Sequence, residues 1–79
     1  MEIVDIFSLP DGRIVYSISS NEVPEIHVGD YLVDCKGNEI RITGVGAATK
    51  CFGLRYAFSL LLDGEAEQGR IRLLPHEKV

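Results

Sequence analysis

The feature that most constrains the fold is the alternation of apolar and polar residues across residues 26–45. A tight bend at residues 29–30 is followed by one expected strand over residues 31–35 and a second over residues 39–45. Side chains on a strand alternate between its two faces, so each segment would direct one apolar face inward. Gly37, between the two segments, belongs to the residue types that tolerate the positive φ of a tight turn. The stretch therefore predicts an antiparallel hairpin.

Four further segments are expected to be strands: residues 2–9, 13–19, 54–62 and 70–74. The first has apolar residues on both sides, as expected of a strand that is covered on both faces or that bends at the corner of a barrel. For residues 54–62 a helix competes, because the leucines and the alanine also fit helical spacing, but the regular aromatic alternation favours a strand. Turns rich in glycine separate the segments. The chain thus predicts an all-β fold, a small six-stranded antiparallel β-barrel that forms a single domain over residues 1–79.

The same alternation predicts which side chains form the core. The residues expected to face inward are Ile14, Tyr16, Ile18, Ile40, Ile42, Phe58, Leu60 and Ile71. Residues 46–53 have no apolar period and are expected to form a loop. Loops of this length in a compact domain are more often functional than short ones.

The acidic balance of the chain argues against a general affinity for nucleic acids. The 79 residues include 12 acidic and 8 basic residues, for a net charge of −4. Residues 1–35 hold seven acidic residues and one basic residue, whereas residues 36–79 hold five acidic and seven basic residues. Affinity for nucleic acids depends on neutralising phosphates, so only a local basic face in the second part could supply it.

Neither a membrane segment nor a metal site is expected. No apolar run is long enough to cross a membrane and the first residues carry no secretory signal, so a cytoplasmic location is expected. In such a reducing compartment Cys35 and Cys51 should be unpaired thiols. His27 and His76 are scattered, so the ligand spacing of a zinc site is absent. We expect no metal and no cofactor.

From Phe7 to about residue 74 the chain resembles the second domain of translational GTPases such as elongation factor Tu, the β-barrel beside the GTPase domain. The resemblance rests on the pattern I-x-V-G-D-x-L at residues 26–32 and the pattern I-x-G-V at residues 42–45. Gly64 and Gly69 are similar to glycines near the end of that family's domain. The resemblance implies a docking barrel that binds a protein or RNA partner. The chain has no G-x-x-x-x-G-K-[ST] phosphate loop, so no nucleotide is expected to bind by that mechanism.

Catalysis has little support in the sequence. A catalytic site needs a nucleophile, a base and an orienting group within reach of one another. Cys51 could be combined with His27 or His76, but neither histidine belongs to a recognisable motif. Asp30 is expected to stabilise its own turn, and Asp34 has no second acid beside it on its strand face. We therefore expect a non-enzymatic protein.

One set of residues is a candidate binding site: Arg41, Lys50, Phe52, Arg55, Arg70 and Arg72. If the last strand neighbours the fourth, these residues form a basic stripe beside residues 46–53, and the aromatic ring could stack an RNA base or ribose. The alternative is a solvated polar face with cross-strand partners such as Glu39. The expected function is a binding module that docks to a protein or RNA partner. The rival is a regulatory or structural interaction domain with no link to translation, since one fold hosts many functions.

Overall fold

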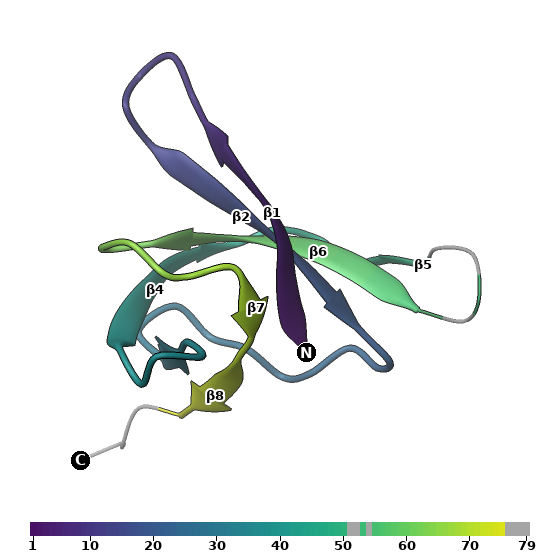
Figure 1. The fold of residues 1–79 in the computed structure, drawn as a ribbon. Helices are drawn as coiled ribbons and strands as arrows, with labels where there is room; N and C mark the ends of the chain where they lie inside the picture. Colours follow the sequence, from purple (N-terminus) through teal and green to yellow (C-terminus); the bar gives the residue numbers. More distant parts are fainter. Residues whose placement is uncertain (51–52, 54, 76–79) are drawn as a thin grey trace.

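The computed structural model describes residues 1–50, 53 and 55–75, and the protein is an all-β, nearly closed antiparallel barrel (Figure 1). The described residues form the strands β1 (Glu2–Ser8), β2 (Ile14–Ser20), β3 (Tyr31–Val33), β4 (Glu39–Val45), β5 (Thr49–Lys50), β6 (Tyr56–Leu62), β7 (Gly69–Arg70) and β8 (Arg72–Leu74). Seven of them follow one path in the order β7-β1-β2-β6-β4-β3-β8, and β5 pairs with β6 beside that path. The predicted all-β class and antiparallel barrel are confirmed. Over the described ranges, no helix has the length and apolar character needed to span a bilayer.

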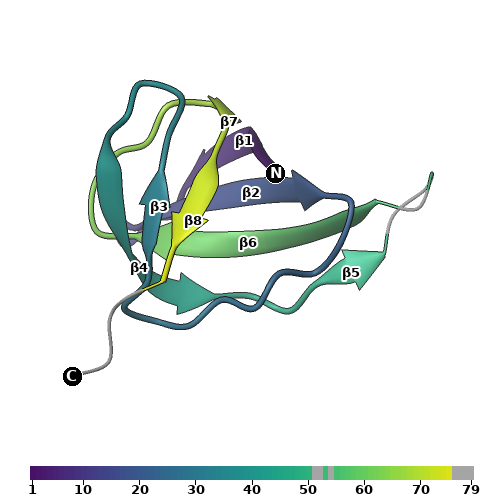
Figure 2. The same cartoon turned by 90° about the horizontal axis from the view of Figure 1, so that it is seen from below.

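The barrel is closed by one short segment that changes its partner strand. β7 pairs with β1, whereas β8 pairs with β3, as Figure 2 shows. Ile71 lies between them, is buried, and donates its backbone N–H to the carbonyl of Met1 (3.1 Å). The arrangement that the basic stripe requires, with the last strand beside the fourth, is therefore not the one found. The expected count of six strands is not confirmed, because this segment is divided in two and β5 forms within the expected loop.

β6 is a strand, and the competing helix does not form in its described residues. It pairs with β2 over six positions, from Val15 opposite Leu61 to Ser20 opposite Tyr56. On its other side it pairs with β4 and β5, which makes β6 a central strand of the barrel wall. Leu54, the expected first residue of this strand, lies outside the described residues.

The hairpin between β3 and β4 has the expected turn, with Gly37 at φ 85°. β3 ends two residues earlier than expected because the chain already turns at Asp34. The carbonyl of Asp34 accepts the N–H of Gly37 (3.0 Å), and its N–H donates to the carbonyl of Asn38 (3.1 Å). In the bend before β3, the Oδ2 atom of Asp30 accepts the N–H of His27 (2.9 Å). Asp30 thus stabilises its own turn, as predicted.

The core lies where the alternation predicts it. Its buried cluster contains Ile3, Tyr16, Ile18, Leu32, Ile40, Ile42, Phe58, Leu60, Ala66 and Ile71. Of the residues expected to face inward, only Ile14 is not a member, and it packs against the cluster half-buried. The pairing of β1 with β2 shifts between Ile3 and Asp5, and a bulge of this kind bends a strand. This bulge explains why the apolar residues of β1 occupy both sides.

The hairpin formed by β1 and β2 extends beyond the rest of the barrel (Figure 1). Its turn has the expected geometry: Gly12 has φ 92°, and its N–H donates to the carbonyl of Leu9 (3.0 Å). The far part of β1 lies beyond the core, so its apolar side chains are exposed, and Phe7 is 51% exposed. The projecting hairpin therefore presents apolar groups to solvent.

Candidate functional site

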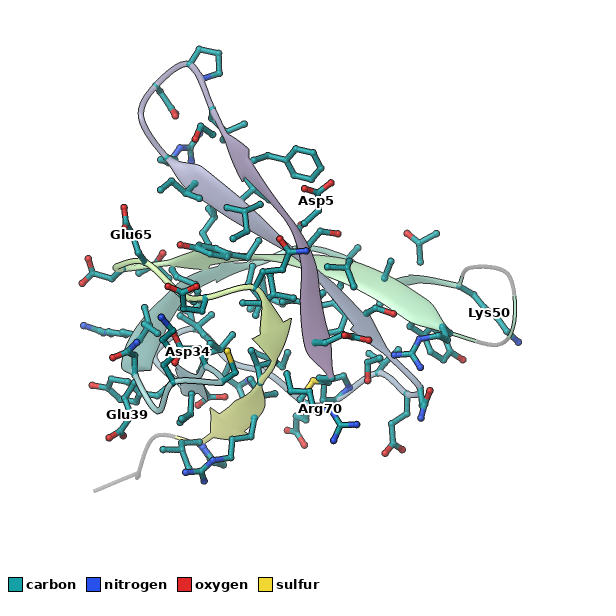
Figure 3. The ribbon with its side chains drawn as sticks, in the orientation of Figure 1. Asp5, Asp34, Glu39, Lys50, Glu65 and Arg70 are labelled. Carbon is teal, nitrogen blue, oxygen red and sulfur yellow. The ribbon has the colours of Figure 1, made fainter. Side chains whose placement is uncertain are left out.

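The six predicted binding residues do not gather on one face of the barrel. Phe52 lies outside the described residues. Lys50 is exposed in β5 and well separated from Arg70 of β7 (Figure 3). The continuous basic stripe required β8 to lie beside β4, and β3 lies between these two strands instead. The predicted set is thus divided into smaller groups.

Arg55 and Arg70 meet at one hollow of about 350 Å³. The hollow is also lined by Met1, Glu2, Asn21 and Ile71. Arg55 is held in place, because its Nε donates to Ser19 Oγ (2.9 Å) and its Nη1 donates to Asn21 Oδ1 (2.7 Å). Glu2 lies directly opposite Arg70 in the pairing of β1 with β7. An acidic group therefore accompanies the two arginines, which weakens this hollow as a site for anions.

Arg41 and Arg72 lie in strands on either side of Tyr31. Tyr31 is opposite Arg41 in the pairing of β3 with β4, and Arg72 lies in β8 on the other side of β3. The ring of Tyr31 is 39% exposed, whereas the next residue, Leu32, is fully buried. Sequence reasoning assigned the aromatic role to Phe52 and missed Tyr31, although alternation with Leu32 placed it on the solvent side. An exposed ring near two guanidinium groups can stack a nucleic-acid base.

A row of apolar residues crosses the outer face of four strands. Phe7 of β1 lies opposite Val15 of β2, and Val15 lies opposite Leu61 of β6. Leu61 in turn lies opposite Gly44 of β4. Neighbouring strands are about 4.8 Å apart, so this row, called the apolar stripe below, is about 14 Å long. Sequence reasoning missed it because it depends on the register of strands that are distant in the chain.

A hollow lies beside the stripe, where Leu61 covers Gly44. A Cβ atom at Gly44 would lie 2.9 Å from Leu61 Cδ1, so the leucine side chain lies across this glycine. The register of β4 shifts between Ile42 and Gly44, whereas the alternation of buried and exposed residues continues to Val45, which is 42% exposed. The hollow has about 310 Å³ and is lined by Leu9, Val15, Gly44, Val45, Gly46, Ser59, Leu60 and Leu61. Most of its side chains are apolar.

A second hollow, of about 320 Å³, adjoins the first because Leu61 lines both. Its charged members are Arg13 and Glu65. The Nε of Arg13 donates to Asp11 Oδ2 (2.6 Å), so the charge of this arginine is already paired. The hydrogen bond from the Arg13 backbone N–H, together with the guanidinium, lowers the pKa of Asp11 and keeps it ionised. Glu65, labelled in Figure 3, makes no ion pair within the described part of the chain.

The carboxylate of Asp34 is structural. It accepts the backbone N–H groups of Lys36 (3.0 Å), Asn38 (2.9 Å) and Glu67 (3.0 Å), and the side-chain amide of Asn38 (3.1 Å). Burial alone would raise the pKa of Asp34, but these hydrogen bonds outweigh it and lower the pKa to about 2. Asp34 therefore ties the turn between β3 and β4 to the segment that leads into β7.

The described residues offer no metal site, since among them no three His, Cys, Asp or Glu side chains could hold an ion. The Cys35 thiol is exposed and unpaired, as predicted, with Sγ 3.8 Å from the Gln68 carbonyl oxygen. Cys51 and His76, from the catalytic combination considered above, lie outside the described residues. His27 Nε2 lies 2.9 Å from a carboxylate oxygen of Glu25 at an exposed position.

Comparisons of the chain with models of protein families, with curated proteins and with solved structures find no match. The candidate surfaces are therefore weighed on their own chemistry.

Proposed function

We propose that the chain is a non-enzymatic binding module that docks to a protein partner through the apolar stripe. The observation that carries this proposal is the row of Phe7, Val15 and Leu61 on the outer face of a sheet whose inner face is already packed. Tyr16 and Leu60, on the inner face of the same strands, are each 1% exposed. The stripe is therefore additional to the core. Covering it with a partner would gain about 25 cal/mol per Å² of apolar surface, and aromatic residues are enriched at such interfaces.

The projecting hairpin makes part of the stripe accessible to a partner. Phe7 and Val15 pair across the two strands of the hairpin, which extends beyond the rest of the barrel (Figure 1), and Phe7 is 51% exposed. A partner can therefore approach the stripe without displacing another part of the described chain. Of the three side chains of the stripe, Phe7 is exposed and Val15 and Leu61 are half-buried. Apolar side chains that adjoin one another across strands are typical of an interaction site, whereas single scattered apolar residues are ordinary.

RNA is the second candidate partner, and the Tyr31 face supports it. Arg41 lies opposite Tyr31, and Arg72 lies opposite Val33, two positions along the same strand, so stacking and phosphate contacts could combine there. The net charge of −4 opposes this candidate, because it repels phosphates. A protein partner is therefore the leading proposal.

We also propose that the barrel is of the type found as the second domain of translational GTPases. Its support is the contact between the two parts of the sequence that carry the resemblance. The N–H of Gly29 donates to the carbonyl of Ile42 (2.9 Å), and the N–H of Ile42 donates to the carbonyl of Asp30 (2.8 Å). Both patterns thus serve one structural unit, the bend packed against β4. A regulatory or structural interaction domain without a link to translation is the alternative.

Capture from the native lysate tests the proposed function. Tagged wild-type protein would be compared with Phe7→Ser and with Val28→Ser, a control at an exposed position outside the stripe. Protein partners should be recovered at least tenfold less with Phe7→Ser and equally with Val28→Ser, with or without ribonuclease. Loss of partners on ribonuclease treatment and in the double variant Arg41→Ser/Arg72→Ser, but not in Phe7→Ser, would favour RNA. Ribosomal proteins or a translational GTPase among the partners would support the link to translation.

A further inference from the structure

We propose that the apolar stripe and Glu65 together bind a protein segment that carries a large apolar side chain next to a lysine or arginine. This inference rests on the proposed function and adds the chemistry of the partner. It follows from two neighbouring hollows of different character. The first is lined mostly by apolar side chains, the second contains an acidic group, and Leu61 lines both. A segment that crosses Leu61 would reach both hollows.

The first hollow fits one large apolar side chain. Its volume of about 310 Å³ corresponds to on the order of ten water molecules, and such water is displaced at low cost from apolar walls. Leu9 and Val15 stand on one side, and Val45 stands on the other. Because the Leu61 side chain lies across Gly44, an incoming group would contact this leucine rather than the backbone of β4. A central apolar anchor in a pocket is the usual source of binding energy at protein interfaces.

The charges around the stripe select a basic neighbour for that anchor. Arg13 is paired with Asp11, which leaves Glu65 as the unbalanced charge of the second hollow. Asp5 lies two residues before Phe7 on the same strand face and adds a second carboxylate at the hairpin end of the stripe (Figure 3). A lysine or arginine beside the anchor would therefore meet a carboxylate on either side. Complementary charges of this kind determine specificity and association rate more than affinity.

The same charges oppose the other occupants. A second copy of the chain would bring its own Asp5 and Glu65, and a net charge of −4, against the same carboxylates. A nucleic acid would bring phosphates against them. A basic, apolar protein segment is therefore the occupant that the stripe fits.

Titration of the isotope-labelled protein with two capped tripeptides, Lys-Phe-Lys and Glu-Phe-Glu, tests the inference. Amide shifts at Val15, Gly44 and Leu61 report occupation of the stripe. The basic peptide should bind there at least tenfold more tightly than the acidic one. Glu65→Gln should reduce that preference at least threefold, whereas Glu22→Gln, a matched loss of charge beyond the other end of β2, should not.

A second variant separates the apolar contact from the charge. Val15→Thr keeps the shape of the side chain and should weaken both peptides by a similar factor. Equal binding of the two peptides at the stripe would overturn the basic partner while leaving docking at the stripe intact. A preference that persists fully in Glu65→Gln would also overturn it. Amide shifts confined to Arg55 and Arg70 would overturn it as well. Failure of the proposed function would appear in the other experiment, as equal recovery of protein partners from the lysate with wild type and with Phe7→Ser.

Discussion

The hydroxyl of Tyr16 gives the sharpest test of how the barrel is held closed. Tyr16 is 1% exposed, and its Oη donates to the carbonyl of Gly64 (3.2 Å) and accepts the N–H of Ala66 (3.1 Å). These two hydrogen bonds join the core to the segment that leads into β7. Tyr16→Phe removes both of them and changes little else. The variant therefore measures what this connection contributes to folding.

The expected cost follows from the two groups left behind. Gly64 is exposed, so water can bond to its carbonyl, but Ala66 is buried, so its N–H loses its partner. Leaving a buried donor unsatisfied costs about 1–3 kcal/mol, whereas a bond that water replaces costs less. We expect the free energy of unfolding to fall by about 2 kcal/mol. For a domain of this size that corresponds to a decrease in Tm of roughly 8–16 °C.

Urea denaturation followed by circular dichroism would measure this change, with Tyr31→Phe as the matched control. Tyr31 is 39% exposed, and its variant should stay within about 0.5 kcal/mol of the wild type. The slope of the free energy of unfolding against urea concentration should stay the same, because the surface exposed on unfolding hardly changes. Hydrogen exchange of the Ala66 amide should accelerate in Tyr16→Phe. An unchanged midpoint together with unchanged protection of Ala66 would refute the reasoning.

Three further predictions concern the core, the contact between Gly44 and Leu61, and the buried carboxylate. Ile42→Ala removes a side chain that is 0% exposed and should lower the free energy of unfolding by about 2–5 kcal/mol in urea denaturation; an unchanged midpoint would show that β4 does not direct it inward. Gly44→Ala should destabilise because Leu61 must move, and less so in a Leu61→Ala background; strict additivity in this double-mutant cycle would show that the contact is unimportant. The ionised Asp34 stabilises the fold above its ordinary pKa of 3.8, and this contribution should be lost as the pH falls toward about 2. Asp34→Asn should therefore be less stable at neutral pH and should lose less stability over that acid range in a pH titration of unfolding.

Local sequence patterns predicted the strands and their inward faces because both are determined by residues that are close together in the chain. Ile40 and Ile42 face the core by simple alternation, and Gly37 marks its turn by the φ that it tolerates. Alternation fails at the bulge of β1, where one extra residue changes the face. Ile3 and Ile6 lie opposite Ile18 and Tyr16 on one face of the sheet for this reason, although they are three positions apart. A bulge has no reliable signal in a single sequence, since it arises from how two strands fit.

The candidate sites were harder to predict because they depend on pairing between distant segments. Nothing in the alternation of β8 indicates that its neighbour is β3, yet this pairing decides that Arg72 lies across from Val33 and near Tyr31. The stripe likewise requires Val15 to lie opposite Leu61, 46 positions away in the chain. A shift of one residue in that register would turn Leu61 toward the core and remove the stripe.

Two hydrogen bonds favour docking on the face of β1 over docking on its edge. β7 pairs with only the first two residues of β1, and an edge left open beyond that point could accept an added strand. Here Gln68 donates its side-chain amide to the carbonyl of Val4 (3.1 Å), and Asp5 Oδ1 accepts the N–H of Ile6 (2.9 Å). Two backbone groups on this edge are thus already bonded to side chains, and one of those side chains, Asp5, is charged. The bulge in β1 also disturbs the register that an added strand would need. Phe7 lies on the face of the same strand, so a partner reaches it without competing for these bonds.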